Sequence, residues 1–196
     1  MKILLLADEE SRYLWDYYRP GMLKDYDLIL AAGDLKASYL SFLVTMANRP
    51  LLYVHGNHDA SYAHRPPEGC QCIDGKLVKI NGLRILGLGG SYMYNGGPHQ
   101  YTERQMRRRI LKLKLKILMA GGVDIVLSHA PVSGYGDMPD PAHMGFECFE
   151  GLIKKYQPAL WVHGHVHKNY GARFQREHRL GNTRIINACG KCDVEL

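Results

Sequence analysis

The chain has 196 residues, a hydrophobic content of 46% and a formal net charge of +6, which together fit a single compact domain over residues 1–196. It has no run of roughly 18 apolar residues, which excludes a membrane-spanning helix. The positive charge favours anionic partners, from phosphate esters to nucleic acid, without choosing among them.

In the first half, buried strands and helices are expected to alternate. Three short runs are almost entirely apolar, as in parallel strands covered on both faces, namely 2–7, 28–32 and 51–55. A helix is expected at 37–47, and a shorter one at about 12–19, where Pro20-Gly21 would end it.

In the second half, two strands are expected at 76–80 and 83–88, because Asn81-Gly82 between them is typical of a hairpin turn. The remaining expected elements are strands at 123–127, 159–163, 171–175 and 183–188 and a helix near 146–156. Strands alternating with helices indicate an α/β fold, and the hairpin makes its sheet mixed.

A long basic helix is expected between a capping box at Thr102 and Gln105 and a stop at Gly121-Gly122. Its basic residues lie within 104–116. One apolar stripe consists of Met106, Ile110, Leu113 and Ile117, and a second, roughly opposite, of Leu111, Leu115 and Leu118. A solvated outer face is the simplest interpretation. A contact between subunits of a homo-oligomer and a nucleic-acid surface are the alternatives.

The five cysteines are expected to be reduced thiols. Cys70-x-Cys72 and Cys189-x-x-Cys192 could pair into a zinc site, but their spacing matches no compact zinc module. The apolar run before Asp8 is too short for a signal peptide, so we expect a cytoplasmic protein without a membrane partner.

Polar residues follow the ends of five of these apolar strands: Asp8, Asp34, Asn57, His129 and His165. In open α/β sheets, ligands gather outside the carboxyl ends of the strands. Loops that are scattered along the sequence are therefore expected to meet at one site.

These residues carry a family resemblance. Five blocks occur in order: Asp8-x-Glu10, Gly33-Asp34, Gly56-Asn57-His58-Asp59, His129 and Gly164-His165-x-His167. The series resembles the signature of calcineurin-like metallophosphoesterases, in which the first block reads Asp-x-His. The resemblance implies a four-layer α/β/β/α sandwich, made of two mixed β-sheets flanked by helices, and a site for two divalent metal ions.

The resemblance also implies a role for each residue. Asp8, Glu10, Asp34 and His167 would bind one metal ion, and Asp34, Asn57, His129 and His165 the other. His58 would be catalytic, beside the leaving group, and Asn57 and His58 would contact substrate. His143 is a further, weaker candidate for substrate binding.

Phosphate-ester hydrolysis explains these residue types. Two cations about 3.5–4 Å apart activate a water and neutralise the phosphoryl oxygens, and a short carboxylate such as Asp34 can bridge them. A bridging hydroxide would then attack in line. Asn57 adds a neutral oxygen, and His58 can protonate the leaving oxygen.

Glu10 departs from the family pattern. Its anionic oxygen favours harder ions, so Mn²⁺ is the expected metal, with Fe, Zn, Ni or Mg as alternatives. It also cancels one positive charge of the site, and we therefore hypothesise a preference for monoanionic phosphodiesters. The alternative is that Glu10 is only a weak ligand. Taken singly, each of these residues has a structural role as alternative, such as a helix cap or a buried histidine.

The expected function is that of a metal-dependent phosphoesterase, more specifically a phosphodiesterase acting on a phosphate ester. Two alternatives stay open. One is a non-catalytic, metal-binding scaffold of the same fold, and the other is a nuclease that uses the basic helix.

Overall fold

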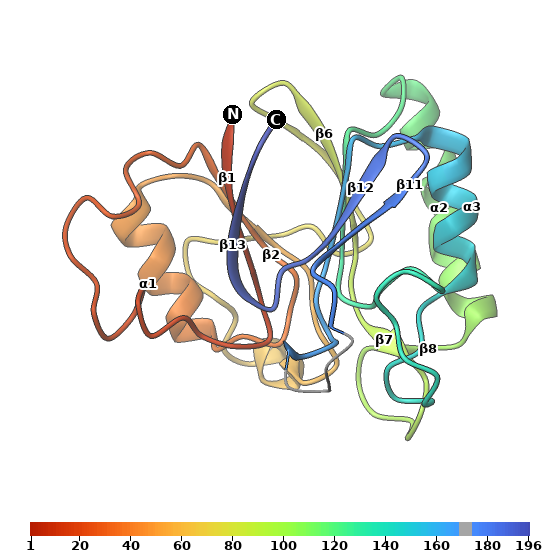
Figure 1. Cartoon of the computed structure of the whole chain (residues 1–196), viewed down its shortest axis with the longest axis horizontal. Coiled ribbons are helices and arrows are strands. Elements are labelled where there is room, and N and C mark those ends of the chain that lie inside the picture. The colour runs from red at the N-terminus through yellow and green to blue at the C-terminus, as the bar shows by residue number, and fades with distance from the viewer. Residues whose placement is uncertain (169–173) are drawn as a thin grey trace.

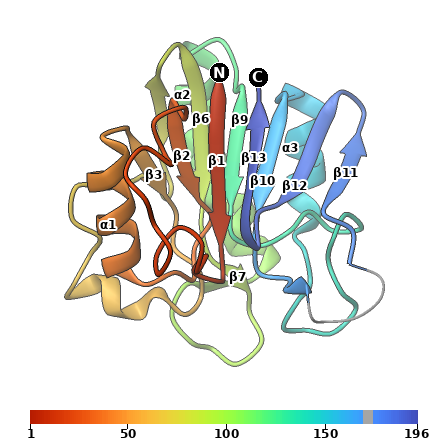
Figure 2. The ribbon, with the colours of Figure 1, turned by 60° about the vertical axis from the view of Figure 1, so that its left-hand side comes forward.

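The structure is a computed structural model, and it describes residues 1–168 and 174–196. Two β-sheets lie face to face in the middle of the molecule (Figures 1 and 2). Helix α1 (Ala37–Ala47) covers the outer face of one sheet, and α2 (Glu103–Met119) and α3 (Glu147–Tyr156) cover the other. The expected four-layer α/β/β/α sandwich is confirmed.

The first sheet has the strand order β13-β1-β2-β3-β4. Its strands are β1 (Lys2–Ala7), β2 (Leu28–Ala31), β3 (Leu51–Tyr53), β4 (Gln71–Cys72) and β13 (Gly190–Glu195). Strands β1 to β4 are parallel, and β13 is antiparallel to β1. The carboxyl ends of the parallel strands therefore share one edge.

The second sheet has the order β11-β12-β10-β9-β6-β5. Its strands are β5 (Leu77–Ile80), β6 (Leu83–Leu88), β9 (Ile125–Ser128), β10 (Leu160–His163), β11 (Glu177–Leu180) and β12 (Thr183–Asn187). The four inner strands are parallel, and the two edge strands are antiparallel, including the expected hairpin at Asn81-Gly82. Short strands β7 (Ser91–Tyr92) and β8 (Gln100–Tyr101) and a 3₁₀ turn (Asp59–Ala63) lie outside the two sheets.

Strand β1 shows why the central strands are apolar throughout. Ile3 and Leu5 face the second sheet, whereas Leu4 and Leu6 face α1, and all four side chains are fully buried. Successive residues of a strand point to opposite faces, so a strand with a covered face on each side needs apolar residues at every position.

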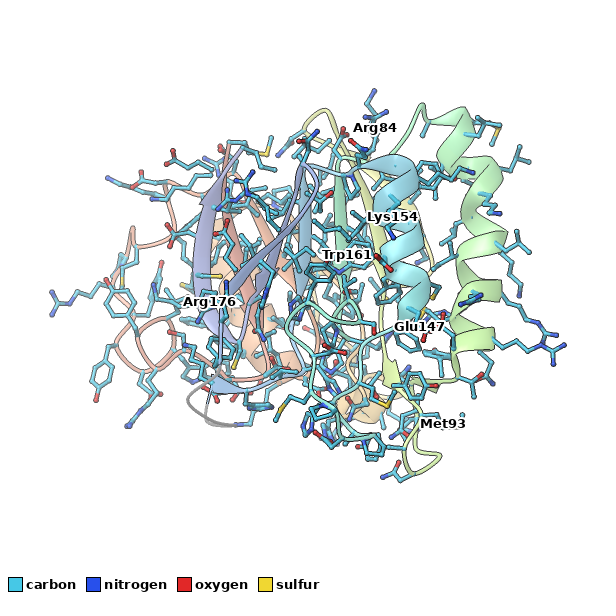
Figure 3. All side chains as sticks on the ribbon, turned by 45° about the vertical axis from the view of Figure 1, so that its right-hand side comes forward. Arg84, Met93, Glu147, Lys154, Trp161 and Arg176 are labelled. Carbon is cyan, nitrogen blue, oxygen red and sulfur yellow. The ribbon has the colours of Figure 1, made fainter. Side chains whose placement is uncertain are left out.

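The outer face of the second sheet packs on α2 and α3 around Trp161, which lies beneath α3 (Figure 3). Its ring centroid is 4.9 Å from that of Phe149, and its indole N–H donates a hydrogen bond of 2.8 Å to Ser128 Oγ. The one polar group of this large side chain is thus satisfied inside the core.

The expected helix at 12–19 is wrong. The segment forms a series of turns, and its aromatic residues pack on α1, with Trp15 4.9 Å from Tyr39 and Tyr18 5.4 Å from Phe42. A helix this short, ended by Pro20, has little stability of its own, so contacts with α1 decide its conformation.

The expected strand at 171–175 can be compared with the structure only at residues 174 and 175, and it is not found there. Residues 171–173 lie outside the described residues, and Phe174 and Gln175 are not in a strand; the strand is β11, at Glu177–Leu180. Strand β13 was not predicted, because it is an edge strand of mixed polarity in which only Gly190 and Val194 are buried.

Helix α2 confirms its expected ends: the Thr102–Gln105 capping box is formed, and Gly121 and Gly122 follow with positive φ. The first stripe is buried, and the second is exposed to solvent, together with Met119. Within the described ranges, no helix is long and apolar enough to cross a membrane.

The cysteines form no disulfide. Cys70 and Cys72 lie at the β4 edge of the first sheet, while Cys192 lies in β13 at the opposite edge. Four strand spacings of about 4.8 Å separate these edges, which rules out a shared zinc ion.

Two leucines of α2 test this packing. Leu113 is 4% exposed and Leu115 is 64% exposed. Leu113→Ala should lower the free energy of unfolding by about 2–5 kcal/mol, because it leaves a cavity against the second sheet. Leu115→Ala should change it by less than about 0.5 kcal/mol. Urea denaturation of both variants measures the difference, and equal losses would contradict the placement of α2.

Candidate metal centre

The expected ligands meet at the edge where the parallel strands end. Asp8 follows β1, Asp34 lies beyond β2, and His129 and His165 follow β9 and β10. The carboxyl end of β1 points toward this edge in Figure 2. Two sheets thus contribute side chains to one place.

Three candidate ligand atoms converge on a fourth, the Nε2 atom of His129. Asn57 Oδ1 and His165 Nδ1 each lie 3.1 Å from this nitrogen, and Asp34 Oδ2 lies 3.3 Å from it. His129 is fully buried, and Asn57 and His165 are nearly so. We call these four residues the His129 group.

Neighbouring groups fix which of these atoms carry hydrogen. A carbonyl oxygen can only accept, so His129 Nδ1 donates to Ala32 O at 2.7 Å and His165 Nε2 donates to Ala142 O at 2.6 Å. The amide nitrogen of Asn57 donates to the Tyr94 hydroxyl at 3.2 Å. In the neutral tautomers, His129 Nε2, His165 Nδ1 and Asn57 Oδ1 therefore present lone pairs to one another.

This donor set fits a divalent ion. Nitrogen and oxygen ligands at the usual 2.0–2.2 Å from an ion lie about 3.0–3.4 Å apart in octahedral or tetrahedral geometry. The separations of 3.1–3.3 Å fall in this range. Lone pairs that face one another without hydrogen repel, so a cation is the natural occupant.

The backbone at the site is held in a conformation that is rare outside glycine. Asp8, Asp34 and His165 have φ values of 64°, 56° and 71°. Left-handed backbone costs non-glycine residues of order 1–3 kcal/mol, and such positions cluster at functional sites. The sharp turns redirect the chain as it leaves each strand.

Asp59 and two glycines hold the loops together. Asp59 Oδ2 accepts hydrogen bonds from the backbone N–H of Asp34 at 2.9 Å and of Gly56 at 2.7 Å. A Cβ atom on Gly56 would lie 1.9 Å from Asp34 Oδ1, and one on Gly33 would lie 2.4 Å from Gly56 N. Only glycine at both positions allows the two loops to approach so closely.

Burial and neighbouring carboxylates shift the pKa values of the two histidines in the His129 group. Burial alone would lower the pKa of His129, but the carboxylates of Asp34 and Asp8 outweigh burial and raise it to about 9. Burial lowers the pKa of His165 to about 3, so this imidazole is neutral at pH 7. A neutral imidazole is the form that binds metal.

Asp8 and His167 lie beside this group. The Asp8 carboxylate is buried and accepts the backbone N–H of His165 at 2.9 Å, and burial raises its pKa to about 6. His167 Nδ1 lies 3.4 Å from Glu9 Oε1. A Cβ atom on Gly164 would lie 2.8 Å from Asp8 Oδ2, so the turn before His165 also needs glycine.

Glu10 points toward α1. Its carboxylate accepts the backbone N–H of Lys36 at 3.0 Å and lies 3.7 Å from Lys36 Nζ. Residues two apart share a side only in an extended segment, and the left-handed turn at Asp8 ends the extended conformation. Metal binding by Glu10 stays a prediction.

Of the three candidate substrate residues, Asn57 belongs to the His129 group, and His58 and His143 lie close to it. The side chain of His58 is exposed, while its backbone N–H donates to Asp34 Oδ1 at 2.8 Å. The His143 ring lies 5.4 Å from the His165 ring, and its Nδ1 contacts Asp140 Oδ1 at 2.8 Å. Their roles toward substrate stay predictions.

Four residues near the expected ligands were not named as site residues from the sequence: Glu9, Asp59, Tyr94 and Cys189. Asp59 belongs to the Gly-Asn-His-Asp block, so the motif itself was the signal. The loop that carries Met93 and Tyr94 extends past the sheet edge (Figure 3), and its Gly- and Tyr-rich composition was a weak signal. Nothing local marks Glu9, and Cys189 was considered only for a zinc site shared with Cys70, Cys72 and Cys192, not as a ligand beside His167.

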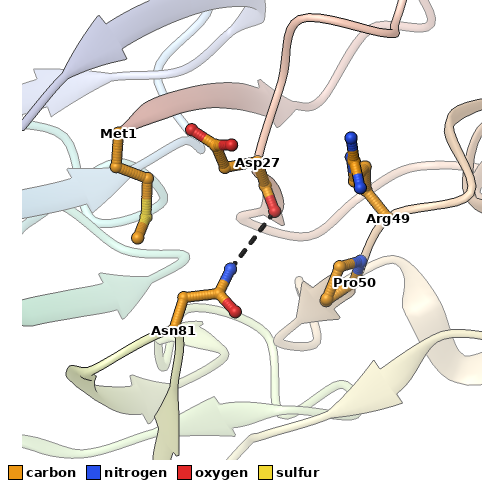
Figure 4. Close-up of a pocket in the computed structure, with 5 residues that line it drawn as sticks. All are labelled: Met1, Asp27, Arg49, Pro50 and Asn81. Carbon is orange, nitrogen blue, oxygen red and sulfur yellow. Dashed lines mark hydrogen bonds between the residues drawn. The ribbon is translucent and has the colours of Figure 1, made fainter.

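A hollow of about 430 Å³ lies at the other end of the strands, lined by Met1, Asp27, Arg49, Pro50 and Asn81 (Figure 4). In it, the Asn81 side-chain amide donates to Asp27 O at 3.4 Å. Met1, Asp27 and Pro50 precede the amino ends of β1, β2 and β3. Ligands of α/β sheets bind at the carboxyl ends, so this hollow is not the candidate site.

Two histidines test the metal centre: His129 in the buried group, and His64, which is exposed at the end of the 3₁₀ turn. A divalent ion at 100 times its dissociation constant should stabilise the protein by about 2.7 kcal/mol and raise its melting temperature by about 5–10 °C. His129→Ala should lose most of this shift, and His64→Ala should keep it. Thermal denaturation with and without Mn²⁺ or Zn²⁺ measures it; a full shift in His129→Ala would contradict the site.

Comparison with known proteins places these residues in a family. A family model described as calcineurin-like phosphoesterase matches residues 7–169. An uncharacterized protein of Haemophilus influenzae is 25% identical over 92% of this chain and 90% of its own. The lariat debranching enzyme of Entamoeba histolytica is 25% identical over 84% of this chain, and that of Drosophila melanogaster 28% over 67%. The chain spans 53% and 32% of these two enzymes.

The fold is also shared with a solved structure. The crystal structure of TT1561 of Thermus thermophilus superposes with a TM-score of 0.61 and 16% identity, covering 96% of this chain and 89% of that one. With a family model that extends over most of the sequence, the chain belongs to the calcineurin-like phosphoesterase family, whose members are metal-dependent phosphoesterases.

Proposed function

We propose that this chain is a phosphodiesterase that works with two divalent metal ions. One observation carries the proposal: the convergence of Asn57, His165 and Asp34 on His129 Nε2 within 3.3 Å. These are the four residues to which the family resemblance gives the second ion. Two such ions, when bound, supply an activated water and neutralise the phosphoryl oxygens.

The chain's own groups would position the substrate and protonate the leaving oxygen. The backbone N–H of His58 is held by Asp34 Oδ1, so the position of His58 is tied to that of a ligand. Its exposed imidazole can reach a substrate at the rim of the buried group. It would donate a proton to the departing oxygen.

The negative charge of the residues around the metal centre favours a phosphodiester over a phosphomonoester as substrate. Asp8, Asp34 and Glu9 place three carboxylates at or beside the expected ligands. They offset most of the charge of two divalent ions and leave little extra attraction for the second negative charge of a monoester. The similarity to lariat debranching enzymes also favours a phosphodiester, because a lariat is a branched nucleic acid.

Two alternatives follow from the same fold. A nuclease would use the basic residues of α2, but this helix lies in the outer layer, and Arg109 is bound to Asp74 and to Gly89 O. A scaffold would need no leaving-group histidine. The retention of His58 beside the His129 group therefore favours an enzyme.

Hydrolysis of chromogenic esters tests the proposal. With Mn²⁺, Zn²⁺ or Fe²⁺ added, we expect a higher kcat/KM for bis-p-nitrophenyl phosphate than for p-nitrophenyl phosphate. His58→Ala should lower kcat for the diester by about a hundredfold or more, because it removes the proton donor.

His64→Ala is the matched control, since His58 and His64 flank the same 3₁₀ turn, and it should leave kcat unchanged. The metal-induced rise in melting temperature should persist in both variants, which shows that the centre is intact. Equal rates in native protein and His58→Ala, or no hydrolysis with any of the metals, would point to the scaffold.

A further inference from the structure

We propose that Glu9, His167 and Cys189 form a metal position that contains a thiolate, beside the His129 group. The ligand atoms of these three residues all lie within 4.8 Å of one another. Carboxylate, imidazole and thiolate are the common protein ligands of zinc and related transition metals. The inference deepens the proposed function, because it names the ligands of one of its two ions.

Three segments far apart in sequence bring these atoms together. Glu9 follows β1, His167 lies in the loop after β10, and Cys189 follows β12. Ala7 and Cys189 are bridge partners, which places the thiol next to the end of β1 and thus next to Asp8. The position therefore adjoins the buried carboxylate that contacts the backbone of His165.

The side chain of Asn187 links Cys189 to the turn that carries His165 and His167. Asn187 Oδ1 accepts the backbone N–H of Cys189 at 2.8 Å, and its side-chain amide donates to Val166 O at 2.8 Å. Asn187 is buried. This link fixes the thiol relative to the segment between His165 and His167, as a rigid ligand position requires.

Exposure gives an ion a route to the sulfur. Cys189 is fully buried, whereas the side chains of His167 and Glu9 are 32% and 44% exposed. The thiol of Cys189 thus lies on the protein side of the proposed metal position, and the Glu9 carboxylate and the His167 imidazole lie on its solvent side. A buried cysteine in a purely structural role behaves as a small apolar residue and packs among other apolar side chains. The carboxylate of Glu9 beside Cys189 does not fit such a role.

The proposed ligand set changes the metal preference. Thiolates favour zinc and other soft or borderline ions, whereas Mn²⁺ prefers carboxylate, carbonyl and water ligands. The two positions of the centre would then differ, with nitrogen and oxygen ligands around His129 and a sulfur ligand at Cys189. We expect zinc or iron rather than manganese at the Cys189 position.

Cobalt substitution tests the inference without relying on activity. Co²⁺ added to the metal-free protein should give visible ligand-field bands and, in the near ultraviolet, a sulfur-to-cobalt charge-transfer band. Cys189→Ser should lose the charge-transfer band, while Cys192→Ser, three residues along the chain, should keep it. Glu9→Gln should weaken Co²⁺ binding by about tenfold or more, and Glu68→Gln, at an exposed carboxylate with no place in the site, should not.

A second variant covers the case in which Cys189→Ser does not fold. Serine at Cys70, Cys72, Cys148 and Cys192 leaves Cys189 as the only thiol, and the charge-transfer band should remain. Ligand-field bands without a charge-transfer band, or a band that survives in folded Cys189→Ser, would overturn the inference and leave the proposed function standing. The absence of any cobalt binding would overturn both.

Discussion

The site depends on a set of hydrogen bonds that direct the N–H groups of its side chains away from one buried point, His129 Nε2. Two backbone carbonyls, those of Ala32 and Ala142, each take the ring N–H of a histidine, and the Tyr94 hydroxyl takes an N–H of Asn57. What remains around His129 Nε2 is a set of lone pairs and a carboxylate oxygen 3.1–3.3 Å away. Such an arrangement is stable only when a positive charge occupies it, either a proton or a metal ion.

The rest of the fold provides the rigidity that this arrangement needs. Strands with both faces covered end at a common edge, and their carboxyl ends deliver Asp8, Asp34 and His165 in left-handed backbone. Asp59 then ties the loops of Asp34 and Gly56 together through two hydrogen bonds. The packed core and the buried carboxylate of Asp59, which is not one of the expected ligands, thus hold the backbone of the site in its strained conformation.

Much of the fold could be predicted from the sequence, because short apolar runs such as 2–7 and 28–32 are typical of strands covered on both faces. The meeting of Asp34, Asn57, His129 and His165 could be expected from their place after strand ends. The directions in which the side chains of Glu9 and Glu10 point could not be predicted. The left-handed turn at Asp8 sends Glu9 toward His167 and Glu10 toward Lys36, and no local pattern reveals a turn of this kind. The segment after Ser11 was also unpredictable, since its contacts with α1 determine its shape.

Anomalous X-ray diffraction from crystals grown with Mn²⁺, recorded near the manganese absorption edge, tests the central claim most directly. We predict a peak surrounded by Asp34, Asn57, His129 and His165, at about 2.0–2.3 Å from one atom of each. Occupied manganese sites found only elsewhere on the protein, with the ring nitrogen His129 Nε2 bonded to no ion, would contradict it.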